Sequence, residues 1–332
     1  MKTSYSLPLL FWLMSIMCLT GQDIHMTDYR TTSNFFNPAM TGQFLGHYKI
    51  QLSVRTQYER TYEQALTGIQ TNINSPLNKK HWIGVGVNFI YDKSGSLSLN
   101  AVNGDLMLGY HMPLGKKQKN TISLGGSLGY ASLFSDPNKY KSEATILGIA
   151  DPDKKSFADL NSKALYQSAG IFLNSIISKK QQFNIGIAML RINAPKFTSA
   201  GTLQNIKWGS RFNLSTGYRQ VIHPLITLAP SIYYSKSEGQ SNINTQMMTD
   251  WKIDPDQSWN FVTGLAYRWK ESANLILGYK SDKLYVSFCF DFLTDVSASI
   301  LKNPGAMELG AYYIIHKTII PKTKPIIFCP SL

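Results

Sequence analysis

Apolar and polar residues alternate with a period of two along much of the chain. Between residues 120 and 132, one face carries the apolar side chains of Ile122, Leu124, Leu128 and Tyr130, and the other carries serine, threonine and glycine. Successive side chains of a β-strand point to opposite sides of the sheet. The alternation therefore predicts a strand with one wholly apolar face.

Fourteen segments carry this alternation, and most of them are about 10 to 13 residues long. Strands of about 9–11 residues cross a bilayer at a tilt, whereas strands of soluble sheets average about 5–6 residues. Aromatic residues also stand at both ends of some segments, as in the girdles of lipid-facing strands. The expected fold class is therefore all-β, an integral outer-membrane antiparallel β-barrel of about 14 strands in the cell outer membrane. The predicted strands are 48–58, 61–72, 81–92, 98–111, 120–132, 164–177, 181–191, 208–220, 225–236, 241–252, 257–269, 273–280, 283–292 and 305–316.

Connection lengths favour a barrel with both termini in the periplasm. Single-chain bacterial barrels have an even number of strands, short periplasmic turns and longer outer loops. The long connections are the fifth, seventh and thirteenth, at 133–163, 191–207 and 293–304. The sheet has to close, because an open edge in hydrocarbon leaves a row of unpaired amides. The segments 133–163 and 22–47 are the candidates for filling the lumen, which is wider than that of an eight-stranded barrel.

The two ends of the chain are expected to lie outside the barrel wall. Lys2 and the apolar run from Leu7 to Leu19 predict a signal peptide, because the run is too short for a spanning helix. A retained membrane anchor and a lipid anchor at Cys18 are the alternatives, and Met17 disfavours the second. The expected parts are a cleaved signal peptide (1–21), an N-terminal periplasmic or plug segment (22–47), the transmembrane β-barrel (48–316) and a C-terminal tail (317–332).

The net charge of +13 permits contact with acidic lipid headgroups or an acidic partner, although a basic solvated surface is the simpler explanation. Nucleic acid is not an expected partner of an exported protein. Outer-membrane lipid is an expected partner. Cys289 and Cys329 remain after cleavage, which is too few for a disulfide scaffold, and both thiols are expected to be unpaired.

Candidate catalytic and metal-binding motifs are weak. Residues 125–129 match the G-x-S-x-G pattern around a hydrolase nucleophile, but that motif needs a strand, a sharp turn and a helix, and here it lies inside a predicted strand. Small residues on a lumen face explain it better than a nucleophilic Ser127. The six histidines are scattered singly, and residues 92–96 are better explained as a hairpin turn than as a calcium loop. We expect no catalytic activity, no cofactor and no bound metal.

The N-terminal block and several shorter runs form a set of recognisable motif positions. Those of the N-terminal block are Gln22, Asp23, Tyr29, Asn37, Pro38, Ala39 and Gly42. Further positions are Arg55, Gln57 and Tyr58, the turn from Asp92 to Gly95, the run from Glu308 to Tyr312, and Cys329 with Pro330. Together they resemble the PorP/SprF family of the type IX secretion and gliding machinery. Ile24, Met26 and the long segment 133–163 depart from the family pattern.

The resemblance implies an outer-membrane barrel that docks, translocates or anchors secreted or surface proteins through their C-terminal domains. Its implied partners are that cargo protein and periplasmic type IX secretion components, and its motif residues are expected to be structural. We expect the three long loops to face cargo, and residues 22–47 and the tail to face periplasmic components. The alternative is an outer-membrane channel or long-chain lipid transporter, since barrels of this size also serve as pores.

Overall fold

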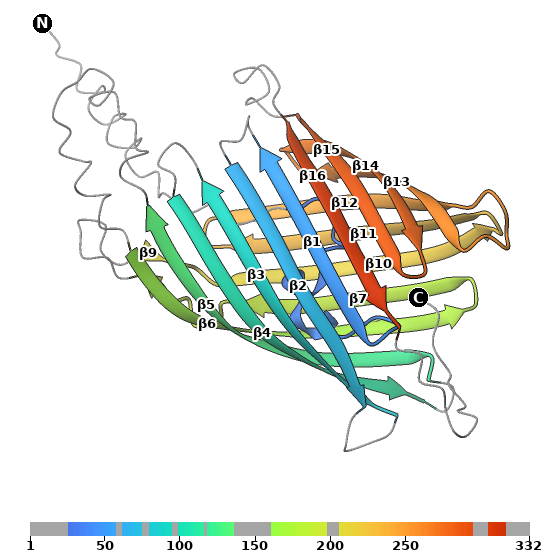
Figure 1. Cartoon of the computed structure of the whole chain (residues 1–332), viewed down its shortest axis with the longest axis horizontal. Coiled ribbons are helices and arrows are strands. Elements are labelled where there is room, and N and C mark those ends of the chain that lie inside the picture. The colour runs from blue at the N-terminus through green and yellow to red at the C-terminus, as the bar shows by residue number, and fades with distance from the viewer. Residues whose placement is uncertain are drawn as a thin grey trace, which may run out of the picture.

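The described part of the chain forms a closed barrel of fourteen antiparallel strands (Figure 1). It is a computed structural model that describes residues 26–57, 62–74, 80–94, 99–115, 118–135, 161–197, 206–294 and 305–316. Each strand pairs with its neighbours along the chain, and β1 closes the barrel against β16. No helix in these ranges has the length and apolar character to span a membrane.

The barrel strands are β1 (Tyr48–Gln57), β2 (Tyr62–Asn74), β3 (Trp82–Ser94), β4 (Leu99–Leu114), β5 (Asn120–Ser135), β6 (Asn161–Ser178), β7 (Gln181–Leu190), β10 (Arg211–His223), β11 (Ile226–Ser237), β12 (Gln240–Trp251), β13 (Trp259–Arg268), β14 (Ser272–Ser281), β15 (Leu284–Leu293) and β16 (Ala306–Ile315). The short strands β8 (Lys196–Phe197) and β9 (Ile206–Lys207) form a separate two-stranded sheet.

The predicted fold class is confirmed, and each of the fourteen predicted segments contains one barrel strand. The observed limits differ from the predicted ones by at most three residues; β6, for example, begins at Asn161 instead of residue 164. The predicted long connection at 191–207 contains a short hairpin that the sequence analysis did not predict, because β8 and β9 pair within it. Phe197 explains the hairpin, since it is only 6 % exposed and packs against the inner wall at Ala131 and Tyr166.

The barrel is apolar outside and polar inside, the reverse of a soluble protein. On β5, Leu128 is 67 % exposed on the outer face, whereas its neighbour Ser127 is 7 % exposed on the lumen side. β13 repeats this arrangement with Leu265 outside and Arg268 inside. An apolar outer surface of this extent needs hydrocarbon around it. The closed barrel and its apolar outer surface place the protein in the outer membrane.

The three longest connections of the barrel all lie at the same end. At one end, two residues each link β6 to β7, β10 to β11 and β14 to β15. At the other end, much longer segments link β5 to β6, β7 to β10 and β15 to β16. Short turns are typical of the periplasmic side of such barrels and long loops of the outer side. β1 therefore begins at the periplasmic end, and β16 returns to it.

Leu128, near the middle of β5, gives a test of the lipid-facing surface. We expect Leu128→Arg to lower the free energy of unfolding by about 2–4 kcal/mol, because a charge on the lipid face at mid-bilayer depth is desolvated. The matched control Leu128→Met keeps the surface apolar and should cost less than about 1.5 kcal/mol. Denaturant titration of the barrel in lipid vesicles measures both changes. Equal stability of the two variants would contradict the assignment of this face to lipid.

Candidate functional site: the lumen plug

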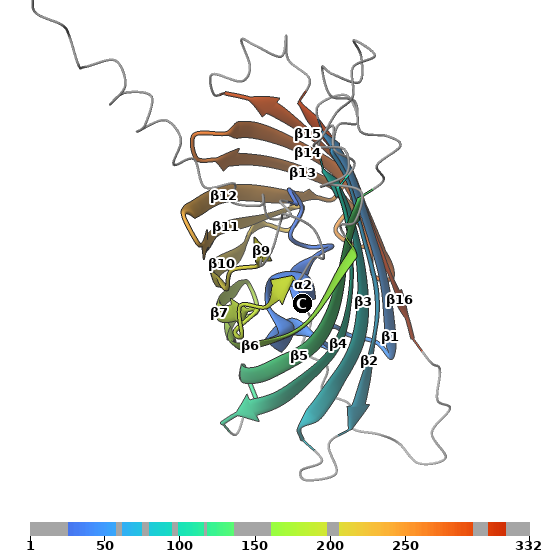
Figure 2. The ribbon, with the colours of Figure 1, turned by 90° about the vertical axis from the view of Figure 1, so that its left-hand side faces the viewer.

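Residues 26–47, called the plug below, run through the lumen before β1 begins (Figure 2). The plug contains one helical turn, α2 (Ser33–Phe36), and the 3-10 turn η1 (Pro38–Met40). Its polar residues are shut away from solvent. Those with at most 1 % exposure are Thr27, Asp28, Thr31, Thr32, Asn34, Asn37 and Thr41. Buried polar groups have to find hydrogen-bond partners, and here the barrel wall supplies most of them.

The plug, as far as the structure describes it, begins near the outer end of the lumen and ends near the periplasmic end. Thr27 lies beside Arg55 and Glu308, near the outer ends of β1 and β16. The carbonyls of Phe44 and Gly46 accept hydrogen bonds from Asn72, near the periplasmic end of β2. The described residues of the segment 22–47 are therefore largely enclosed by the barrel rather than spread as a surface for periplasmic partners.

A row of four glycines makes room for the plug in the wall. Gly84, Gly109, Gly125 and Gly170 pair with one another in register across β3, β4, β5 and β6. A Cβ atom at Gly84 or Gly109 would overlap the carbonyl oxygen of Thr41. A Cβ atom at Gly125 would overlap the backbone of Ala39 in η1, and one at Gly170 would overlap the side chain of Asn37. Only glycine leaves space for this approach of backbone to backbone.

The Asn-Pro-Ala run shapes the part of the plug that rests on the glycine row. The Asn37 Oδ1 accepts a hydrogen bond of 2.9 Å from the Ala39 N–H and so caps η1. The Asn37 Nδ2 donates to the carbonyl of Ile171 in β6 at 3.1 Å. Pro38 occupies the first position of η1, where no N–H is needed. Gly42 follows with a φ of +81°, a conformation that favours glycine.

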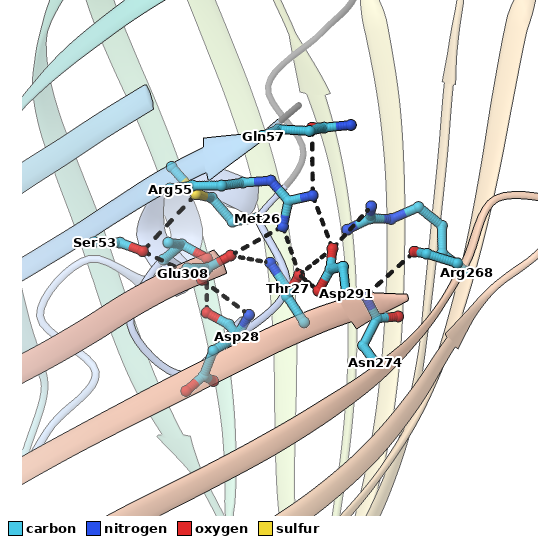
Figure 3. Close-up of polar contacts among 12 residues, drawn as sticks. Met26, Thr27, Asp28, Ser53, Arg55, Gln57, Arg268, Asn274, Asp291 and Glu308 are labelled. Atoms are coloured by element: carbon cyan, nitrogen blue, oxygen red, sulfur yellow. Dashed lines mark hydrogen bonds and ion pairs between the residues drawn. The ribbon is translucent and has the colours of Figure 1, made fainter. Parts of the chain in front are cut away.

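A polar clamp of Arg55, Arg268, Asp291 and Glu308 holds the other end of the plug (Figure 3). Glu308 accepts the backbone N–H of Thr27 at 2.6 Å and the next N–H at 3.1 Å. The hydroxyl of Thr27 donates to Asp291 at 2.9 Å and accepts from the Arg55 Nη1 at the same distance. The plug is therefore held by charge-assisted hydrogen bonds, which are stronger than neutral ones.

Charge balance stabilises the clamp in its enclosed position. Arg55 pairs with Asp291 at 2.8 Å and Arg268 approaches the same carboxylate at 3.6 Å, while Glu308 lies 3.6 Å from Arg55. All four clamp residues are at most 4 % exposed. Loss of one partner would leave a buried charge without compensation, which is far more costly than loss of a surface pair.

Tyr29 and Arg30 connect the plug to the opposite wall. The ring of Tyr29 stacks on Tyr233 of β11, with centroids 3.7 Å apart and planes 11° apart. Burial raises the pKa of Tyr29, although the nearby charge of Arg268 opposes the shift, so its phenol stays protonated. Burial alone would lower the pKa of Arg30, but the carboxylate of Asp250 at 3.0 Å outweighs it and the pKa is raised. Arg30 therefore stays charged.

The outer connection from β7 to β10 folds back over the plug. Arg191 lies 4.4 Å from the Trp208 ring and donates from Nε to the Gly209 carbonyl at 2.9 Å. A cavity of about 30 Å³ lies between these residues and the plug residues Asn34 and Pro38. That volume holds about two or three water molecules and no larger molecule.

The structure brings five of the predicted family positions together in the plug: Tyr29, Asn37, Pro38, Ala39 and Gly42. Asp92 lies apart from them on β3, where it accepts a hydrogen bond from Gln64 at 3.2 Å. Gln22, Asp23, Gly95, Cys329 and Pro330 lie outside the described residues.

Sequence reasoning missed the alignment of the glycines and the clamp residues Arg268 and Asp291. The only signal for either was small or charged residues at lumen-facing positions of predicted strands. Cys289 is buried and free, while Cys329 is not among the described residues.

The hydrolase-like motif serves packing in this fold. Ser127 lies inside the uninterrupted strand β5, so the strand–turn–helix that exposes a nucleophile is not formed there. Gly125 belongs to the glycine row, and a Cβ atom at Gly129 would overlap the ring of Tyr166. These contacts account for both glycines without a reacting serine.

Adjacent glycines provide a matched test of the plug seat, which is the contact between the glycine row and residues 37–42 of the plug. We expect Gly125→Ala to destabilise the protein by about 1–3 kcal/mol, because the added methyl group displaces Ala39. Gly126→Ala faces the outside, where its Cβ lies 3.6 Å from the nearest atom, and should be nearly neutral. Hydrogen exchange of residues 37–41 should accelerate in the first variant only. Unchanged exchange in Gly125→Ala would contradict the seat.

Glu308→Gln tests the clamp. We expect a loss of about 3–5 kcal/mol in the free energy of unfolding, because Arg55 loses a buried counter-charge. The control Glu63→Gln breaks a half-exposed pair with Lys93 and should cost about 1 kcal/mol or less. Guanidinium titration compares the two. Similar losses in both variants would show that the clamp does not hold the plug by charge.

Comparison with solved structures shows the fold. CymD, a monoaromatic hydrocarbon channel, matches with a TM-score of 0.50 and 10% identity, over 86% of this chain and 93% of that chain. A TodX mutant, also a monoaromatic hydrocarbon channel, matches with a TM-score of 0.50 and 10% identity, over 84% and 92%. The toluene transporter TbuX of Ralstonia pickettii gives a TM-score of 0.48 at 9% identity, over 86% and 94%. No curated protein matches the sequence.

The sequence profile of a family described as "Type IX secretion system membrane protein PorP/SprF" matches residues 19–313. The match spans the plug and almost the whole barrel, including Asn37, Pro38 and Glu308. The chain belongs to the PorP/SprF family of type IX secretion system membrane proteins.

Proposed function

We propose that this protein is a sealed docking barrel of the type IX secretion machinery, which receives or anchors a secreted or surface protein through its C-terminal domain. The observation that carries the proposal is the plug, together with the family membership. A lumen occupied by enclosed plug residues is suited to binding at its mouths rather than to passage of a polypeptide.

The way the plug is held supports binding over passage. It is fixed at the outer end by the clamp, in the middle by the glycine row and near its periplasmic end by Asn72. Expelling it would leave Arg55 and Asp291 without their contacts to Thr27. Cargo then meets the outer rim, where the described part of the connection from β7 to β10 folds over the plug around Trp208.

A channel or lipid transporter is the second candidate. The observation in its favour is the likeness in fold to CymD, which concerns the fold alone. Against it stands the cavity of about 30 Å³ between plug and outer connection, which is far smaller than the roughly 300–1,000 Å³ of small-molecule sites. A hollow of about 520 Å³ is lined by the exposed residues Ile232, Met247 and Leu265, so it lies on the lipid-facing side of the wall and not along the lumen. Uptake of a long-chain fatty acid by vesicles carrying the purified barrel would support this candidate over docking.

Deletion of the gene tests the docking function. We expect one or a few exported proteins to be lost from the cell surface, with no general change in permeability, because a docking barrel serves particular cargo. Mass spectrometry of surface and secreted proteins measures this loss. The wild-type gene should restore the missing proteins, and so should the Gly126→Ala variant, which leaves the plug seat intact. Unaltered surface and secreted proteomes in the deletion strain would contradict the proposal.

A further inference from the structure

Four cationic side chains gather toward the periplasmic end of the lumen, below the clamp. Lys49 is the second residue of β1, and Lys280 is the last but one of β14. Arg219 lies in the periplasmic half of β10, and Arg30 extends from the plug to the same wall. These four residues are called the cationic mouth below.

One carboxylate is shared among three of these cations. Asp250 pairs with Arg30 at 3.0 Å and with Lys280 at 3.2 Å, and the charge of Arg219 also acts on it. The Nε of Arg219 is buried without a hydrogen-bond partner. One carboxylate cannot pair closely with three cations, so Arg219 is left with an unmet demand for an anion.

The remaining cation has no ion-pair partner among the described residues. The Nζ of Lys49 lies 4.6 Å from the centre of the Tyr312 ring. The carboxylate whose charge acts on Lys49 is that of Asp28, which accepts a hydrogen bond from the Tyr285 hydroxyl at 2.6 Å. Four cations and the two carboxylates Asp28 and Asp250 leave a net charge of +2 in this part of the lumen.

The positive charge is specific to this end of the lumen and is reachable from solvent. The clamp near the outer end has two arginines and two carboxylates, and Glu271 adds a third carboxylate 2.8 Å from Arg268, so no positive charge is left over there. In the cationic mouth, the side chains of Arg30 and Lys280 are 21% and 27% exposed. A charged recess with low-dielectric walls concentrates the field and attracts ions of opposite sign.

We propose that the cationic mouth binds an acidic segment of a periplasmic protein, whose carboxylate side chains contact the exposed Arg30 and Lys280 and balance the excess charge of Arg219 and of the buried Lys49. Lipid phosphate is the less suitable occupant, because these side chains face the lumen and headgroups stay outside the wall. Because Arg30 belongs to the plug, such a partner contacts barrel and plug together. The proposal does not depend on docking of cargo at the outer rim.

Binding of a fluorescent hexaglutamate peptide to the purified full chain in detergent tests this inference. We expect saturable binding by fluorescence anisotropy that weakens as salt is raised, because the attraction is electrostatic. Arg219→Gln and Lys49→Gln should each weaken binding about tenfold, because each removes one unbalanced positive charge from the recess. The control Lys270→Gln alters an exposed lysine in the outer turn and should bind as the wild type does.

Stability separates a ligand-binding role from a structural one. Arg219→Gln relieves repulsion with Arg30, so its unfolding midpoint should be equal to or above that of the wild type. Absence of peptide binding, or equal binding by the wild type and both mouth variants, would overturn the inference. Inorganic phosphate that binds as tightly as the peptide would replace the acidic segment with a free-anion site. Loss of binding in Lys270→Gln would move the site to the outer end.

Discussion

Closure of the sheet in hydrocarbon is the constraint from which the rest of this structure follows. Every strand amide inside the membrane has to pair with another strand, so the sheet closes on itself through β1 and β16. A closed sheet of fourteen strands is too wide for wall side chains alone to fill, as they do in eight-stranded barrels. The wall therefore encloses a lumen, and the N-terminal segment occupies it. The polar lumen face, the glycine row and the clamp are all consequences of accommodating that segment.

The short sequence motifs that are scattered along the chain meet in one structural unit. The Asn-Pro-Ala run supplies the turn that rests on the wall, and glycines from four strands supply the surface beneath it. Arg55 from the first strand and Glu308 from the last one hold the start of the plug, at the seam where the barrel closes. The clamp thus couples the plug to barrel closure, because its charges depend on both strands being in register.

The sequence was sufficient for the strands and insufficient for the plug seat, for a physical reason. Alternation is local, so each strand and its lipid face could be predicted from about ten neighbouring residues, as with Leu128 and Ser127. The glycine row depends on register between four strands, and the clamp joins Arg55 to Asp291 across most of the chain. The hairpin of β8 and β9 was missed because burial of Phe197 against the wall, rather than any alternation, determines it. The N-terminal segment was left as either periplasmic or plug, since the side chains of the lumen that receive it were unknown.

Conductance across a planar bilayer tests the sealed lumen most directly. The intact barrel and a variant that lacks residues 26–42 would be compared at the same voltage and salt concentration. The account predicts a closed intact barrel and a variant that conducts ions, because removing the plug leaves the lumen of a fourteen-stranded barrel open to water. Equal, steady conductance by both proteins would contradict it.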